Sequence, residues 1–136
     1  MSRYLRLALA AIAVSFAATP SLHAQPYPSK PIKMIVPFPA GGTTDIVARM
    51  LADKLADSMK GVFVVENRPG AANMIGMEAG AKAAADGYTL VMGSTTSLSV
   101  VPHLYAKVPY TEKDFAAVSL VGLLNTALIA NGNVSQ

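Results

Sequence analysis

The chain contains no cysteine among its 136 residues. This absence excludes disulfide bonds, a thiolate nucleophile and a lipid-modified N-terminal cysteine. Histidine is scarce as well: His23 and His103 are the only two, and neither belongs to a group of acidic residues with metal-ligand spacing. We therefore expect no metal site, no cofactor and no histidine–acid pair that could activate a nucleophile.

Residues 1–24 have the pattern of a secretory signal peptide. Arg3 and Arg6 give a basic start, and Ala24 lies at the expected cleavage edge. The apolar run between them, residues 7–18, is shorter than the roughly 20 residues that a membrane-spanning helix needs. Cleavage near Ala24 would leave nine Lys or Arg against eight Asp or Glu. We therefore expect a periplasmic protein without stable membrane insertion, and the alternative is that residues 1–24 stay attached as an uncleaved N-terminal anchor. We expect no binding of nucleic acid, because no basic patch remains.

Residues 25–136 alternate between strand and helix patterns, which predicts one α/β domain with a parallel sheet and right-handed crossovers. The expected strands are 32–38, 62–66, 88–92, 118–123 and 126–130; the expected helices are 43–59, 71–85 and a short stretch that ends near Tyr105. Gly61 is expected to end the first long helix. The apolar stripe of that helix is predicted from residues that recur every four positions, Val47, Leu51, Leu55 and Met59, with Ile46 and Met50 beside them.

The loop between the first strand and the first helix is the most informative segment. It reads Pro37-Phe38-Pro39-Ala40-Gly41-Gly42-Thr43-Thr44-Asp45. A helix N-terminus that follows a glycine-rich loop directs backbone N–H groups at one point and favours negative charge there. We predict an anion-binding loop whose candidate residues are Phe38, Pro39, Ala40, Gly41, Gly42, Thr43 and Asp45. For Asp45 we favour a capping role in the first helical turn, where the helix dipole stabilises a carboxylate, with ligand contact as the alternative.

A second polar loop follows the third strand and supplies Ser94, Thr95, Thr96 and Ser97 as further candidates. If the first and third strands are neighbours, both loops lie at one sheet edge, where α/β proteins bind ligands. The alternative is that Gly41-Gly42 forms only a tight turn and Thr43 only caps the helix. The loop lacks both the Gly-Lys-Ser/Thr ending of a P-loop and the spacing of a dinucleotide site.

The chain resembles the substrate-binding proteins of tripartite tricarboxylate transporters, the TctC or Bug-type periplasmic receptors. The residues that carry the likeness are 27–32 (YPSKPI), 36–45 (VPFPAGGTTD), 65–71 (VENRPGA) and 85–90 (ADGYTL), together with Leu104 to Lys107, Pro109, Tyr110, Asp114 and Phe115. The resemblance implies a non-enzymatic type II periplasmic binding protein. Such a protein captures a di- or tricarboxylate, an amino acid or an aromatic acid between two lobes and delivers it to membrane permease subunits.

The chain departs from the pattern of this family in two respects. Residues 97–102 read Ser-Leu-Ser-Val-Val-Pro where the family commonly has Thr-His-Ala-Ile-Asn-Pro, so Leu98 and Val101 replace polar residues. The family continues past the equivalent of Gln136 through a second lobe, so residues 25–136 are expected to form an incomplete N-terminal lobe. Two other functions stay open: an interaction module that pairs through the exposed edge at 126–130, and a hydrolase that uses Ser94 or Ser97.

Overall fold

A three-stranded parallel sheet organises residues 26–123, the part of the chain that the computed structural model describes. Its strand order is β2 (Phe63–Asn67), β1 (Ile32–Val36) and β3 (Thr89–Val91), with β1 in the centre. Ile35 of β1 pairs with Glu66 of β2 on one side and with Val91 of β3 on the other. The predicted parallel α/β fold is confirmed, and so is the prediction that the first and third strands are neighbours.

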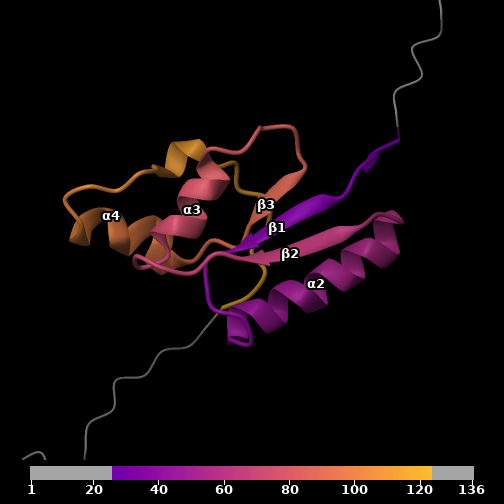
Figure 1. The fold of residues 1–136 in the computed structure, drawn as a ribbon, viewed down its shortest axis with the longest axis horizontal. Helices are drawn as coiled ribbons and strands as arrows, with labels where there is room; N and C mark the ends of the chain where they lie inside the picture. Colours follow the sequence, from indigo (N-terminus) through magenta and orange to yellow (C-terminus); the bar gives the residue numbers. More distant parts are fainter. Residues whose placement is uncertain (1–25, 124–136) are drawn as a thin grey trace, which may run out of the picture.

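Two helices cover opposite faces of this sheet (Figure 1). Helix α2 (Thr43–Met59) packs against β1 and β2, and helix α3 (Met74–Ala81) packs against β1 and β3. The chain therefore moves from β1 to one side of the sheet and then crosses to the other. Because β1 and β3 are parallel neighbours, the loops that follow them both leave from the carboxyl edge of the sheet, next to each other.

The core under α2 is built from Met34 and Val36 of β1 and from two alanines of the helix, Ala48 and Ala52. The prediction of the buried face was therefore wrong in part. Leu51, Leu55 and Met59 are half-buried, whereas Ile46, Val47 and Met50 are exposed. The buried positions 45, 48 and 52 follow helical spacing from Asp45, which is itself buried. The face of α2 that is turned to the sheet is thus the face that carries Asp45, whose polar contacts are described below. The small side chains of Ala48 and Ala52 let the helix lie close to the sheet.

Helix α3 approaches the sheet through Gly76. A Cβ atom at this position would lie 2.6 Å from the Cβ of Pro37 and 2.8 Å from the carbonyl oxygen of Arg68. Only glycine fits at such a separation, so this residue sets the distance between α3 and the carboxyl ends of β1 and β2. The predicted small-residue helix is thus confirmed in kind, although it is shorter than expected.

Several boundaries differ from the prediction for local reasons. Strand β1 ends at Val36 because Pro37 has no N–H to pair, and β2 and β3 each differ from the expected range by one residue at both ends. Helix α3 begins only at Met74, since Ala71, Ala72 and Asn73 have positive φ angles. Helix α2 ends at Met59 as expected, but Lys60 and not Gly61 adopts the left-handed conformation after it. A Cβ at Gly61 would instead collide with Pro28.

The segment after β3 forms a turn of π-helix, η1 (Thr96–Val100), which continues into α4 (Val101–Leu104), and a 3-10 turn, η2 (Glu112–Asp114), follows. Residues 118–123 form no strand, contrary to the prediction, and have exposed apolar side chains. The predicted signal peptide and the predicted strand at 126–130 lie outside the described residues. Within residues 26–123 no helix has the length and apolar character needed to cross a membrane.

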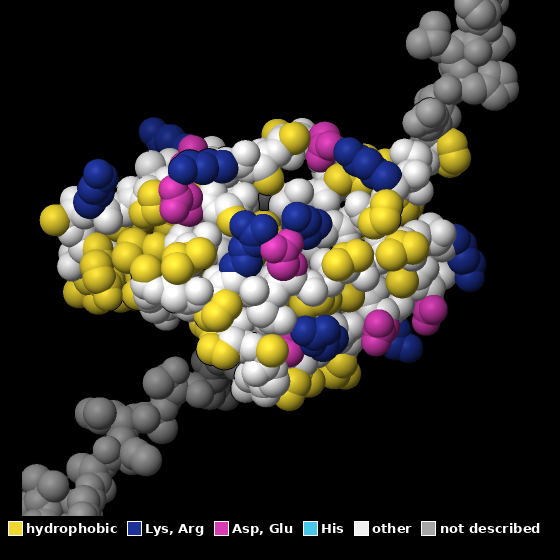
Figure 2. All heavy atoms as spheres, viewed as in Figure 1, with side chains coloured by type: hydrophobic (Ala, Val, Ile, Leu, Met, Phe, Trp, Pro, Cys, Tyr) yellow, Lys and Arg dark blue, Asp and Glu magenta, His cyan; other side chains and the backbone are white. Residues whose placement is uncertain are grey.

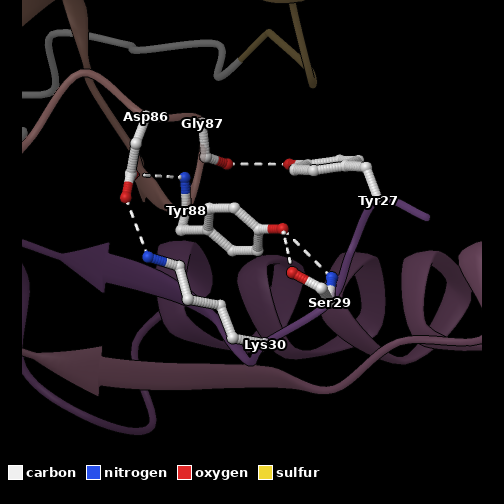
Figure 3. A network of polar contacts seen from close by, with 6 residues as sticks. All are labelled: Tyr27, Ser29, Lys30, Asp86, Gly87 and Tyr88. Atoms are coloured by element: carbon white, nitrogen blue, oxygen red, sulfur yellow. Dashed lines mark hydrogen bonds and ion pairs between the residues drawn. The ribbon is translucent and has the colours of Figure 1, made fainter. Parts of the chain in front are cut away.

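The amino edge of the sheet carries a polar network that ties the segment before β1 to the turn before β3 (Figure 3). Tyr27 donates its hydroxyl hydrogen to the Gly87 carbonyl at 2.7 Å, and the Ser29 amide donates to the Tyr88 hydroxyl at 3.0 Å. Lys30 forms an ion pair with Asp86 at 2.9 Å and lies over the Tyr88 ring. The network consists of exposed and half-buried residues.

Candidate functional site

The loop after β1 reaches α2 through two glycines that have different conformations. Gly41 has a φ of 81°, which is strained for any side chain, whereas Gly42 is extended with a φ of −77°. Gly42 occupies the N-cap position of α2, so the alternative that Thr43 only caps the helix is wrong. Gly42 has no side chain with which to cap the first turn. The first N–H groups of an α-helix have no acceptor within the helix, and within residues 26–123 the amides of Thr43 and Thr44 have no hydrogen-bond partner.

Asp45 holds this loop from within the helix. Its side chain is buried, with 3% of the residue exposed. One carboxylate oxygen, Oδ2, accepts hydrogen bonds from the Gly41 amide at 2.8 Å and from Arg49 Nε at 3.0 Å. The other, Oδ1, accepts one from Asn67 Nδ2 at 2.8 Å. Asp45 therefore does not cap an amide of the helix itself, and its carboxylate accepts the Gly41 amide of the preceding loop instead.

The pKa of Asp45 reflects these contacts. The hydrogen bond from the Arg49 guanidinium, followed by those from the Gly41 amide and the Asn67 side chain, lowers it from 3.8 to about 2. The carboxylate is therefore ionised throughout the physiological pH range. Its charge is compensated by Arg49, which matters at a site that would accept a second anion.

Sequence reasoning missed Asn67, because the second strand was expected to end at residue 66. The residue ends β2, and its side chain contacts the loop and α2 together: Nδ2 donates to the Phe38 carbonyl at 3.1 Å as well as to Asp45, and Oδ1 accepts from Arg49 Nη2 at 2.9 Å. The partners lie 18 to 29 residues away in sequence. The only local signal was an amide side chain at the end of a strand whose carboxyl edge carries a loop.

The second loop has a different internal structure. Ser94 Oγ accepts a hydrogen bond from the Ser97 amide at 3.1 Å and lies 2.9 Å from Ser97 Oγ. Ser97 is fully buried, and its carbonyl accepts the Tyr110 hydroxyl at 2.7 Å. Tyr110 is buried against Phe115 and anchors this loop. Thr95 and Thr96 are the exposed residues of the loop.

The structure thus divides the candidate residues into two groups. Those that offer exposed or half-buried atoms at the carboxyl edge are Phe38, Pro39, Ala40, Gly41, Gly42, Thr43, Ser94, Thr95 and Thr96. Asp45 and Ser97 are buried and support the loops from within. The Phe38 side chain packs partly against the core under α2, and its carbonyl oxygen accepts a hydrogen bond from Asn67.

No arrangement for catalysis or metal binding accompanies these loops in residues 26–123. The hydroxyls of Ser94 and Ser97 bond to each other, and His103 is exposed on α4. No group of three His, Asp or Glu side chains converges in this part of the chain. Arg68 pairs locally with Glu66 at 2.6 Å, and Lys33 contacts the same carboxylate at 3.1 Å. These contacts lower the pKa of Glu66, with the Arg68 hydrogen bond as the main cause.

Residues 47–135 match the model of the tripartite tricarboxylate transporter family receptor. Among individual proteins, the chain is 45% identical over 133 residues to Protein BugT of Bordetella pertussis, an alignment that covers 96% of this chain and 40% of BugT. The chain therefore spans less than half of the length of this relative.

Solved structures agree with the sequence comparison. The periplasmic binding protein BugD matches with a TM-score of 0.59 and 42% identity, over 62% of this chain and 28% of BugD. A Rhodopseudomonas palustris protein solved with adipate, Rpa4515, has a TM-score of 0.57 and 33% identity, over 64% of this chain and 29% of that one. MatC from the same organism, solved with bound malate, has a TM-score of 0.52 and 30% identity, over 62% and 29%. The described fold is therefore part of a periplasmic binding protein.

Proposed function

This chain belongs to the tripartite tricarboxylate transporter receptor family, and we propose that it captures a small organic carboxylate in the periplasm without chemical conversion. The observation that carries the proposal is the uncapped first turn of α2 at the carboxyl edge of the sheet, where Thr43 and Thr44 present backbone N–H groups. A carboxylate at this position would accept hydrogen bonds from those amides and would be favoured by the helix dipole.

The arrangement of Asp45 supports the same proposal. A carboxylate side chain beside an anion site would repel the ligand if it were free, but Asp45 is buried and engaged by Arg49, Gly41 and Asn67. The hydroxyls of Thr95 and Thr96 are the donors that the second loop would contribute. Catalysis has no support from these residues, since no base is bonded to Ser94 or Ser97 within residues 26–123.

The substrate class is proposed from the two solved relatives that hold adipate and malate, both of them dicarboxylates. We propose a dicarboxylate as the first ligand to test, with tricarboxylates, amino acids and aromatic acids as further members of the class. Delivery to membrane permease subunits, and cleavage of residues 1–24 during export, are part of the same proposal and follow from the family.

The experiment is a titration of the ¹⁵N-labelled chain followed by amide NMR, which detects weak binding. We expect malate or adipate to shift the amide signals of Thr43, Thr44, Thr95 and Thr96 in a saturable manner. Adipamide, which has the same length as adipate but no charge, is the matched control and should leave them in place. Equal shifts with adipate and adipamide, or none with any carboxylate at millimolar concentration, would contradict the proposal.

A second candidate is an interaction module, and one observation favours it. The side chains of Val118 and Leu123 are 83% and 82% exposed, and Figure 2 shows further hydrophobic side chains gathered at the end of the molecule where α4 lies. Light scattering distinguishes the two functions, because an interaction module would gain mass with concentration and would show no response to carboxylates.

A further inference from the structure

Asn67 is the one side chain that joins β2 to both parts of the first loop. It contacts the Phe38 carbonyl before the glycines, and it contacts Asp45 and Arg49 after them. Its backbone is meanwhile fixed by the sheet, since Asn67 pairs with Val36 and the next amide, that of Arg68, donates to the Val36 carbonyl at 2.9 Å. The loop is therefore held against a rigid point of the fold.

We propose that Asn67 is a positioning residue of the carboxylate site: its amide group fixes the path of the loop so that the open amides of α2 face the ligand. This inference rests on the proposed function for its ligand but not for its geometry. Asn67 touches the loop backbone and Asp45, and it acts on the ligand only through them.

The chemistry of the site requires an amide at this position. The side-chain N–H groups of Asn67 donate hydrogen bonds to two different acceptors, Phe38 O and Asp45 Oδ1, and its side-chain oxygen accepts a hydrogen bond from Arg49. A planar group with two donors and an acceptor is offered at this length by asparagine alone. Aspartate has the same shape but no donor in its ionised form, so it would place a second carboxylate against Asp45.

The Gly41 amide gives a direct readout because it donates to the same carboxylate, at Oδ2. Its NMR shift should follow the titration of Asp45, whose pKa is about 2 in the native chain. The other charged groups near this carboxylate are Arg49 on the same helix and Asp53, which acts on Arg49. The test variant is Asn67→Asp, and Asn67→Ala removes the same hydrogen bonds without adding charge.

Asn73→Asp is the matched control. It makes the same chemical change at a position whose side chain caps nothing and whose φ of 74° aspartate tolerates as asparagine does. We expect the Gly41 titration to move upward past 3.8 in Asn67→Asp, because neighbouring carboxylates cannot both ionise easily. In Asn67→Ala it should move upward by less, and in Asn73→Asp it should stay in place.

Ligand binding is the second readout, measured with adipate and malate at neutral pH. We expect Asn67→Asp to weaken the binding by about tenfold or more, the effect of losing roughly 1.4 kcal/mol, and Asn73→Asp to leave it unchanged. An Asn67→Asp or Asn67→Ala chain with a native Gly41 shift and titration would overturn the inference. If the native chain binds no carboxylate while the Gly41 titration still moves in the variants, the proposed function fails and the positioning of the loop stands.

Discussion

The two edges of the sheet each carry a polar network that joins segments far apart in sequence, and the networks differ in what they leave unpaired. At the amino edge, Tyr27, Ser29, Lys30, Asp86 and Tyr88 satisfy one another and the Gly87 carbonyl (Figure 3). At the carboxyl edge, Asp45 and Asn67 bond to each other and to the loop, but the amides of Thr43 and Thr44 have no partner in the part of the chain that the structure describes. The first network joins its polar groups to one another, whereas the second lies beside the amides that we propose as the carboxylate site.

Burial separates the two networks as well. Asp45 is buried, whereas the side chains of the Lys30–Asp86 pair are 55% and 42% exposed. Water and salt screen exposed ion pairs, so such pairs contribute little to stability. We therefore expect the loss of a buried contact at the carboxyl edge to cost more stability than the loss of an exposed contact at the amino edge.

The largest effect is expected from Gly76→Val, which would disturb the carboxyl edge from the α3 side. The added side chain has no room beside Pro37 and the Arg68 carbonyl, and overpacking of this kind costs about 3 kcal/mol. Urea unfolding measures the loss. Gly122→Val is the control, since a Cβ at Gly122 would meet nothing within 4 Å; equal stability of the two variants would show that α3 does not pack as described.

Tyr110→Phe should have the next largest effect, because it removes the anchor of the second loop. The Ser97 carbonyl would lose its buried hydroxyl partner, and an unsatisfied buried acceptor costs about 1–2 kcal/mol. Hydrogen exchange should locate the change in residues 97–101. Tyr105→Phe, at an exposed tyrosine of the same region, should leave exchange and stability as they are; the same loss in both variants would argue against the anchor.

A smaller effect distinguishes the two glycines of the first loop. Gly41→Ala forces a side chain into a positive φ, at a cost of about 1 kcal/mol, although there is space for the added atom. Gly42→Ala should be nearly neutral for stability, since its φ is ordinary and its Cβ would lie 3.4 Å from the Pro39 carbonyl. Thermal unfolding and the carboxylate titration together test this. A Gly42→Ala chain less stable than Gly41→Ala would reverse the assignment.

The sequence predicts the carboxyl edge less completely than it predicts the fold. Local patterns were enough for the bounds of α2 and for the parallel sheet, because helix periodicity and buried apolar strands are properties of short windows. The buried face of α2 was predicted wrongly in part, since Asp45, Ala48 and Ala52 face the sheet while the larger apolar residues Ile46 and Met50 are exposed. Asn67 could not be found because its partners are distant in sequence. The strand predicted at residues 118–123 was wrong because this apolar segment has no strand partner among the described residues.

The smallest effects should come from removing one positive charge at each edge. At the carboxyl edge, Asp45 stabilises the fold above its ordinary pKa of 3.8, and this contribution is lost as the pH falls through about 2. Arg49→Gln removes the main cause of the lowered pKa, so the contribution should shrink and should be lost at a higher pH. Acid unfolding monitored by circular dichroism measures the shift.

Lys30→Gln makes the corresponding change at the amino edge. The ion pair with Asp86 raises the pKa of Lys30, but the pair is exposed. We therefore expect its loss to change the unfolding temperature little, and this small change to vanish when salt is added. Added salt should reduce the difference between Lys30→Gln and the native chain more than the difference between Arg49→Gln and the native chain. A Lys30→Gln chain that is more sensitive to acid than Arg49→Gln would mean that the amino edge, and not the network around Asp45, carries the charged contacts on which the fold depends.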